Sequence, residues 1–203
     1  MHISEGVLSA PILISGAVLT AAGVTVGLKK MKDQDIPRTA LISAALFVAS
    51  LIHLPLGPTS VHLILNGTAG IILGWQIFPA ILISLFLQSI LFQFGGITTL
   101  GINTFNIAFP GIAAYYLFSF ARINSNFRLG ILSFISGGFS VFLTSILVAF
   151  SLVFTEQSFL EIAKLSVVSY LPVIIIEGII TVFVVFSIKK ININILGGIK
   201  EDV

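Results

Sequence analysis

The sequence from Thr39 to Ala121, which begins TALISAALFVASLIHLPLG and ends FPGIAAYYLFSFA, contains no Asp, Glu, Lys or Arg in 83 residues. A water-soluble domain of this size keeps too much surface exposed to hide so long an uncharged stretch. Over the whole chain 57% of the 203 residues are hydrophobic and 9% are charged, against about 45–50% and about 25% in soluble domains. This composition excludes a cytosolic enzyme, a nucleic-acid-binding domain and a disordered chain, and it indicates an all-α, polytopic membrane protein.

Several kinds of chemistry are missing from the sequence. The chain has no cysteine, which excludes disulfides, thiolate metal sites and cysteine nucleophiles. It also lacks the P-loop, His-Glu-x-x-His and Gly-x-Ser-x-Gly motifs. Its net charge of +2 is too small to indicate an anionic partner such as nucleic acid. We therefore expect no enzyme and no bound cofactor, and any ATP-driven step would belong to other polypeptides.

Seven apolar segments are each expected to form a transmembrane helix, within one domain covering residues 1–203. A helix needs about 20 residues to cross the bilayer, and it satisfies all its backbone hydrogen bonds within the segment. A β-barrel is excluded, because its strands alternate between apolar and polar residues and these segments are continuously apolar. The predicted spans are residues 7–28, 38–54, 60–75, 78–94, 103–120, 129–154 and 166–188. The short, Pro- and Gly-interrupted span 60–75 is typical of segments that line a binding site in transporters, and the glycine-rich stretch 94–104 is too polar to face lipid.

Basic residues set the predicted orientation. Nine of the ten lie after the first, fifth and seventh spans, and only Lys164 lies elsewhere. Seven spans place these three regions on the cytoplasmic side, including the tail of residues 189–203. The N-terminus is then outside and, having no basic segment before its apolar run, it is not expected to be a cleaved signal peptide.

A histidine at position 2 allows a specific metal chelate. The free amine of Met1, the amide nitrogen of His2 and its imidazole can bind one ion through unstrained five- and six-membered rings. One further imidazole completes a square-planar four-nitrogen site, which suits Cu(II) or Ni(II) better than tetrahedral Zn(II). His62 is the best candidate for that fourth ligand, because it opens the interrupted span on the same side of the membrane. Composition alone favours the alternative that these histidines only make hydrogen bonds.

Four further residues are predicted to surround this site. They are His53, Asn66, Asn103 and Glu177. His53 is a candidate relay, and Glu177 is the only acidic residue within a span, where a carboxylate is costly without a partner. Glu177 is interpreted as an anchor for a ligand loop, as a proton relay or as a structural group. On the second span Ala40, Ala44, Ala45 and Ala49 are spaced to let another helix approach closely, either within the bundle or from a partner.

Several blocks of the chain resemble the CbiM/NikM family, the substrate-binding (S) components of energy-coupling-factor transporters for cobalt and nickel. The similar blocks are Met1-His-Ile-Ser-Glu-Gly6, residues 57–67 (GPTSVHLILNG), 74–80 (GWQIFPA), 91–106 (LFQFGGITTLGINTFN) and 172–181 (PVIIIEGIIT). Together they extend over nearly the whole chain. The resemblance implies seven helices, with residues 1–6 placed in the core as the metal-chelating segment, and a square-planar site made by Met1, His2 and His62.

The resemblance also implies partners and a location. These are a membrane-embedded coupling (T) subunit that contacts the alanine surface, ATP-binding subunits, a small accessory membrane subunit, and the cell membrane of a prokaryote. The expected function is uptake of Co(II) or Ni(II), linked to cobalamin biosynthesis in the cobalt case, with residues 95–106 closing over the ion. Two alternatives remain open: an S component for an organic vitamin, with a site lined by some of the 18 Phe, and an assembly subunit or intramembrane enzyme that transports no ion.

Overall fold

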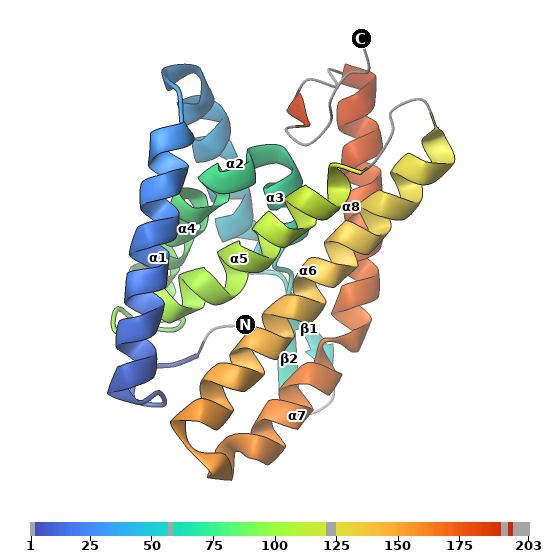
Figure 1. Ribbon diagram of the computed structural model, residues 1–203. Helices are drawn as coiled ribbons and strands as arrows, with labels where there is room; N and C mark the ends of the chain where they lie inside the picture. The colour runs from blue at the N-terminus through green and yellow to red at the C-terminus, as the bar shows by residue number, and fades with distance from the viewer. Residues whose placement is uncertain (1–2, 57–58, 121–124, 192–194, 197–203) are drawn as a thin grey trace.

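The computed structural model describes residues 3–56, 59–120, 125–191 and 195–196, with the backbone alone for residues 53–56 and 59–61. Helices dominate it (Figure 1). In chain order the helices and strands are α1 (Ala10–Lys30), α2 (Ile36–Ala49), β1 (His53–Leu56), β2 (Thr59–His62), α3 (Asn66–Leu73), α4 (Ile77–Phe92), α5 (Leu100–Phe118), α6 (Asn126–Thr155), α7 (Leu160–Ser169) and α8 (Leu171–Ile191). Short 3₁₀ turns at Asp33–Asp35, Gly74–Gln76 and Gln157–Phe159 join some of them.

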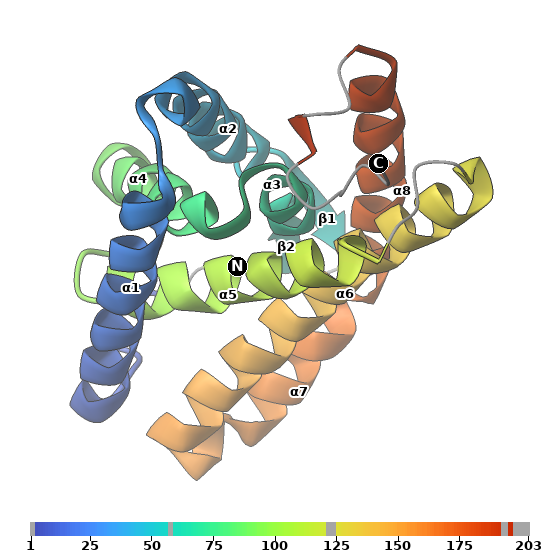
Figure 2. The same cartoon turned by 45° about the horizontal axis from the view of Figure 1, so that its top comes forward.

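Helix α5 runs through the middle of the molecule. Helix α1 packs against one end of it and α6 against the other, with α3 beside it (Figures 1 and 2). Helix α8 lies along α6, while α2 and α4 pack together behind α1 in the view of Figure 1, where α4 also packs against α5. Small residues allow the closest of these contacts, because a Cβ added at Gly16, Gly70 or Gly137 would overlap the helix opposite.

The distribution of polar and apolar side chains is the reverse of that in a soluble protein. Large apolar side chains lie on the outer surface, among them Leu41, Phe154 and Phe183, which are 70% or more exposed. Polar side chains are buried between the helices: the fully buried ones include Asn66, Thr104, Ser140, Thr144, Glu177 and Thr181. A surface of this kind is stable against lipid, which cannot hydrogen-bond. Buried polar side chains such as Asn66, Thr144 and Thr181 form hydrogen bonds in the interior instead.

Four stretches within the described residues are long and apolar enough to cross a membrane. They are Ala10–Lys30, Asn66–Phe92, Asn126–Thr155 and Gln157–Ile191. Helix α2, with 14 residues, is shorter than a typical span, and α3 and α4 lie within one of the four stretches. The seven-span topology and the placing of the two termini therefore stay predictions.

Two local predictions are wrong. Residues 60–75 do not form one helix, because residues 59–62 pair with residues 53–56 as an antiparallel hairpin and α3 begins only at Asn66. Residues 95–106, expected to close over the ion as a loop, are helical from Leu100 onward, where α5 begins and carries Asn103 and Asn106. A further helix that was not predicted, α7, ends at Ser169 and overlaps the start of the predicted seventh span, and α8 begins only at Leu171, with Pro172 in its first turn.

Candidate metal centre

His62 ends strand β2 and is buried, with 8% of its surface exposed. Its Nδ1 lies 3.0 Å from the carbonyl oxygen of Leu63. The tautomer that carries its proton on Nδ1 donates to this oxygen and has its lone pair on Nε2. A carbonyl partner of this kind fixes the orientation of metal-binding imidazoles, so the local geometry suits coordination through Nε2.

The backbone pairing of the hairpin brings the two internal histidines together. In the register of β1 and β2, His53 lies directly opposite His62. In the sequence alone His53 is a candidate neighbour of the site without a structural reason. The hairpin supplies that reason at the level of the backbone.

The buried carboxylate of Glu177 on α8 holds the segment that follows His62. It accepts hydrogen bonds from the backbone N–H of Ile64 at 2.5 Å and of Leu65 at 2.9 and 3.0 Å. Leu65 has a left-handed backbone, with φ of 53°, a conformation that a branched side chain adopts only when its surroundings impose it. Glu177 therefore fixes the point at which the chain turns from the hairpin into α3.

Asn66 is the first residue of α3, and no part of it is exposed. Its Nδ2 donates to the carbonyl oxygen of Ile107 on α5 and to Thr144 Oγ1 on α6, both at 2.9 Å. The beginning of α3 is thus tied to three helices, α5, α6 and α8, through Asn66 and Glu177.

Asn103 on α5 holds the first described residue of the chain. The backbone N–H of Ile3 donates to Asn103 Oδ1 at 3.1 Å, and Asn103 Nδ2 donates to the Ile3 carbonyl oxygen at 3.0 Å. Ile3 is 6% exposed. A second contact lies nearer the surface, where Glu5 accepts the backbone N–H of Thr98 at 3.1 Å. The segment before α1 is therefore folded back into the interior and does not extend outward.

A small cavity of about 20 Å³ lies beside His62, which is room for roughly one water molecule. Ser50, Ser84, Gln88 and Ile107 contribute to its lining. Ser84 and Gln88 were not predicted from the sequence; Gln88 Nε2 donates to Ser84 Oγ at 3.0 Å. Their i, i+4 spacing places two polar side chains on one face of the apolar helix α4. That pattern could have indicated that this face of α4 is turned towards a site in the interior.

Two of the predicted ligands, Met1 and His2, lie outside the described residues. No cluster of three or more His, Asp or Glu side chains able to hold a metal ion occurs in the part of the chain that the structure describes. Of the predicted partner contacts, Ala40, Ala44 and Ala45 are exposed on α2, whereas Ala49 is buried within the molecule. Ala49 therefore does not belong to an outer surface of this chain.

Comparisons with known proteins agree with one another. The chain is 45% identical, over 194 residues that make up 94% of each chain, to a protein of Haemophilus influenzae whose name describes a metal transport protein. It is 32% identical to the cobalt transport protein CbiM of Clostridium tetani, covering 99% of this chain and 90% of the relative. A crystal structure of a transition metal transporter superposes with a TM-score of 0.73 at 26% identity, over 94% of this chain and 93% of that one.

The match to a family description has the same extent. Residues 2–195 correspond to the cobalt uptake substrate-specific transmembrane region named CbiM. This range includes the hairpin, the buried carboxylate on α8 and the asparagine that holds Ile3. The chain therefore belongs to the CbiM family of transmembrane metal-uptake proteins.

Proposed function

We propose that this chain is the substrate-binding membrane subunit of an ATP-driven energy-coupling-factor importer for Co(II) or Ni(II). The observation that carries the proposal is the pair of hydrogen bonds between Asn103 and the backbone of Ile3. These bonds hold the segment next to Met1 and His2 inside the molecule, on the helix that also borders His62. The names of the relatives support a metal as the transported substrate.

The geometry of α5 supports a site shared by the start of the chain and the hairpin. Asn103 and Ile107 are one turn apart, about 6 Å along the helix axis. Ile107 lines the cavity beside His62, and the two residues before Ile3 can extend up to about 7 Å. In the proposal the amine of Met1, the amide and imidazole of His2, and the imidazole of His62 supply four nitrogens in a plane.

The donor set decides which ions the site accepts. Binding releases protons, because the amine and the amide coordinate only in their deprotonated forms. A plane of four nitrogens favours Ni(II) through its low-spin d⁸ configuration and disfavours Zn(II). Thioether ligands are absent from the proposed set, so Cu(I) is poorly served.

The proposed partners contact the chain outside this site. The exposed alanines of α2, Ala40, Ala44 and Ala45, leave room for a helix of the membrane-embedded coupling subunit to approach. ATP-binding subunits and a small accessory membrane subunit complete the importer. Buried Ala49 is excluded from this contact.

The test measures metal bound per chain after purification and loading with NiCl₂ or CoCl₂, by elemental analysis. The unaltered protein is expected to hold one ion per chain. His62→Ala, or one residue added before Met1, should abolish binding while the thermal unfolding midpoint in detergent stays within a few degrees. One residue added after Val203 is the matched control and should bind normally. Full metal content in the protein extended before Met1 would contradict the site, and an empty unaltered protein would contradict the function.

A further inference from the structure

A second cavity, of about 270 Å³, lies where α1 ends, α2 begins and the chain passes from α3 to α4. Its lining includes Lys30, Arg38, Trp75, Gln76, Tyr115 and Tyr116. It shares none of its lining residues with the cavity beside His62. The metal proposal therefore leaves this cavity without a role.

The cavity is bordered by positive charge. Lys30 is the last residue of α1, and Arg38 lies in the first turn of α2. Residues 29–38 hold four basic residues against two acidic ones, Asp33 and Asp35. Neither of these carboxylates lines the cavity, so an anion entering it meets the cations first.

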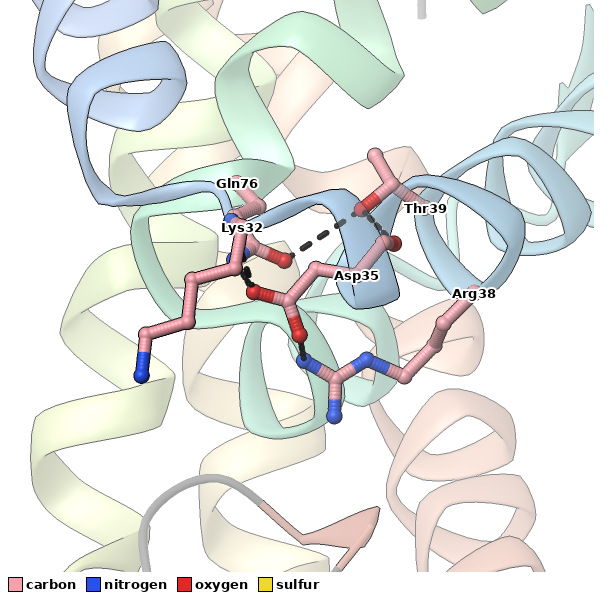
Figure 3. Close-up of polar contacts among 5 residues, drawn as sticks. All are labelled: Lys32, Asp35, Arg38, Thr39 and Gln76. Atoms are coloured by element: carbon pink, nitrogen blue, oxygen red, sulfur yellow. Dashed lines mark hydrogen bonds and ion pairs between the residues drawn. The ribbon is translucent and has the colours of Figure 1, made fainter.

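The carboxylate nearest to Arg38 is already fully engaged (Figure 3). Asp35 Oδ2 accepts from the backbone N–H of Lys32 at 3.1 Å and from Gln76 Nε2 at 2.9 Å, and Oδ1 accepts from an Arg38 amino group at 3.0 Å. The bond from Lys32, then those from Gln76 and the charge of Arg38, lower the pKa of Asp35 against the effect of burial. This network fixes the position of the guanidinium group.

A buried donor of Arg38 is unused. Its Nε is buried and donates to no acceptor among the described residues. A buried charged donor without an acceptor is costly, and guanidinium groups bind phosphate oxygens through two adjacent N–H groups. Arg38 is therefore positioned and oriented for an anion with several oxygens.

Part of the cavity lining is aromatic and lies where α1 ends and α2 begins. Trp75 Nε1 donates to the Tyr116 hydroxyl at 3.0 Å, and the Lys30 ammonium lies 5.3 Å from the centre of the Trp75 ring. Tryptophan and tyrosine concentrate at the headgroup level of membranes. On the helix ends beside the cavity, Leu28 and Ile36 expose more than half of their surfaces, which gives acyl chains an apolar surface to contact.

We propose that this cavity binds the phosphate of an anionic phospholipid headgroup, through the guanidinium of Arg38 and the ammonium of Lys30. Trp75 and Tyr116 form its aromatic border, and the acyl chains extend along the outer surfaces of α1 and α2. Inorganic phosphate offers the same oxygens. The lipid is preferred because the cavity adjoins exposed apolar surface at the ends of membrane-spanning helices.

The single tryptophan of the chain makes the proposal directly measurable, because Trp75 lines the cavity. The full chain, purified in detergent, is titrated with dioleoylphosphatidylglycerol, with dioleoylphosphatidylcholine and with inorganic phosphate. Fluorescence of Trp75 reports occupancy, and native mass spectrometry counts bound lipids. A saturable response to phosphatidylglycerol, with none to phosphatidylcholine at equal concentration, is expected.

Three variants locate the binding. Lys30→Gln and Arg38→Gln should each weaken phosphatidylglycerol binding about fivefold. Lys29→Gln removes the same charge one residue away, from a side chain outside the cavity lining, and should bind as the unaltered chain does. Should Arg38→Gln fail to fold, Lys30→Gln carries the test, because Lys30 is exposed at a helix end.

Two results would overturn the proposal. Equal phosphatidylglycerol binding by the unaltered chain, Lys30→Gln and Lys29→Gln would show that the lipid does not bind in this cavity. A response to inorganic phosphate with none to phosphatidylglycerol would exclude the lipid as the source of the anion. Metal content measured on the same samples should not change, so failure here leaves the proposed metal function unaffected.

Discussion

Glu177 shows how much of this molecule depends on single polar side chains in an apolar setting. Its carboxylate lies on α8, more than 110 residues along the chain from the two backbone N–H groups that it accepts. Those groups belong to residues two and three after His62, next to the left-handed Leu65. Whatever moves this carboxylate also moves the turn that presents the imidazole.

Replacing Glu177 by Gln tests that dependence. The amide keeps the size of the side chain but presents one NH₂ group to backbone donors that need acceptors. We expect nickel or cobalt affinity, measured by isothermal titration, to fall about tenfold, the lower end of the effect of residues that support metal ligands. Glu161→Gln, an identical change at a side chain that is 81% exposed, should leave the affinity unchanged. An unaltered affinity in Glu177→Gln would show that His62 does not depend on this anchor.

The residues of the candidate site were partly predictable from sequence. His62 and Glu177 are ionisable groups within apolar segments, which is a strong signal in a membrane protein. Asn103 carried a weaker one, because it lies where the glycine-rich stretch 94–104 meets the predicted span 103–120. Its role depends on Ile3, exactly one hundred positions away in the chain, and no local pattern contains that information.

At the scale of helices, the contact of α3 with α5 is the tightest point near the site. A Cβ at Gly70 would overlap the backbone carbonyl of Gly111, and a Cβ at Gly111 would approach the carbonyl oxygen of Asn66 to 2.8 Å. Backbone atoms cannot rotate away as a side chain can. Helix α3, which begins with Asn66, can therefore lie directly against α5, because Gly70 and Gly111 have no side chains where the two helices cross.

Gly70→Ala should destabilise the protein by about 1–3 kcal/mol, the usual cost of overpacking. Alanine is otherwise the better helix former, so local propensity predicts the opposite sign. Gly130→Ala on α6 is the control, since its added Cβ would meet only the Phe186 ring at 3.6 Å, and it should be neutral or slightly stabilising. Thermal unfolding in detergent separates the two, and equal midpoints would contradict the packing argument.

Helices were predictable where apolar residues run without interruption. Helices α1, α6 and α8 lie close to their predicted spans for this reason. The hairpin was missed because residues 53–62 combine apolar residues with Pro55, Gly57 and Pro58, a pattern that fits an interrupted span equally well. Its pairing is a backbone register between residues 53–56 and 59–62, which composition does not reveal.

At the scale of the whole molecule, the basic segments lie at one end. The connection between α1 and α2, the beginning of α6 and the end of α8 are together at the top of Figure 1, while the turn from α6 into α7 is at the opposite end. Lys30, Arg38, Arg128 and Lys190 belong to the first group. This is the arrangement that the charge-based orientation requires.

Single cysteines can test this orientation, because the chain has none of its own. We place them at exposed positions: Gln34→Cys and Lys190→Cys on the predicted cytoplasmic side, Thr98→Cys and Gln157→Cys on the predicted outer side. In intact cells a membrane-impermeant maleimide should label Thr98→Cys and Gln157→Cys only. Labelling of all four after membrane disruption is the control, and the reverse pattern in intact cells would invert the topology.

The pair of hydrogen bonds between Asn103 and the backbone of Ile3 also constrains the order of events in biosynthesis. Ile3 leaves the ribosome long before α5 has been synthesised, yet its hydrogen-bonding partner lies on α5. Ile3 therefore lacks its hydrogen-bonding partner while about a hundred more residues are translated and inserted. Closure of the interior is consequently a late event in biogenesis, and a nascent chain stalled before α5 would expose its earliest residues to proteases.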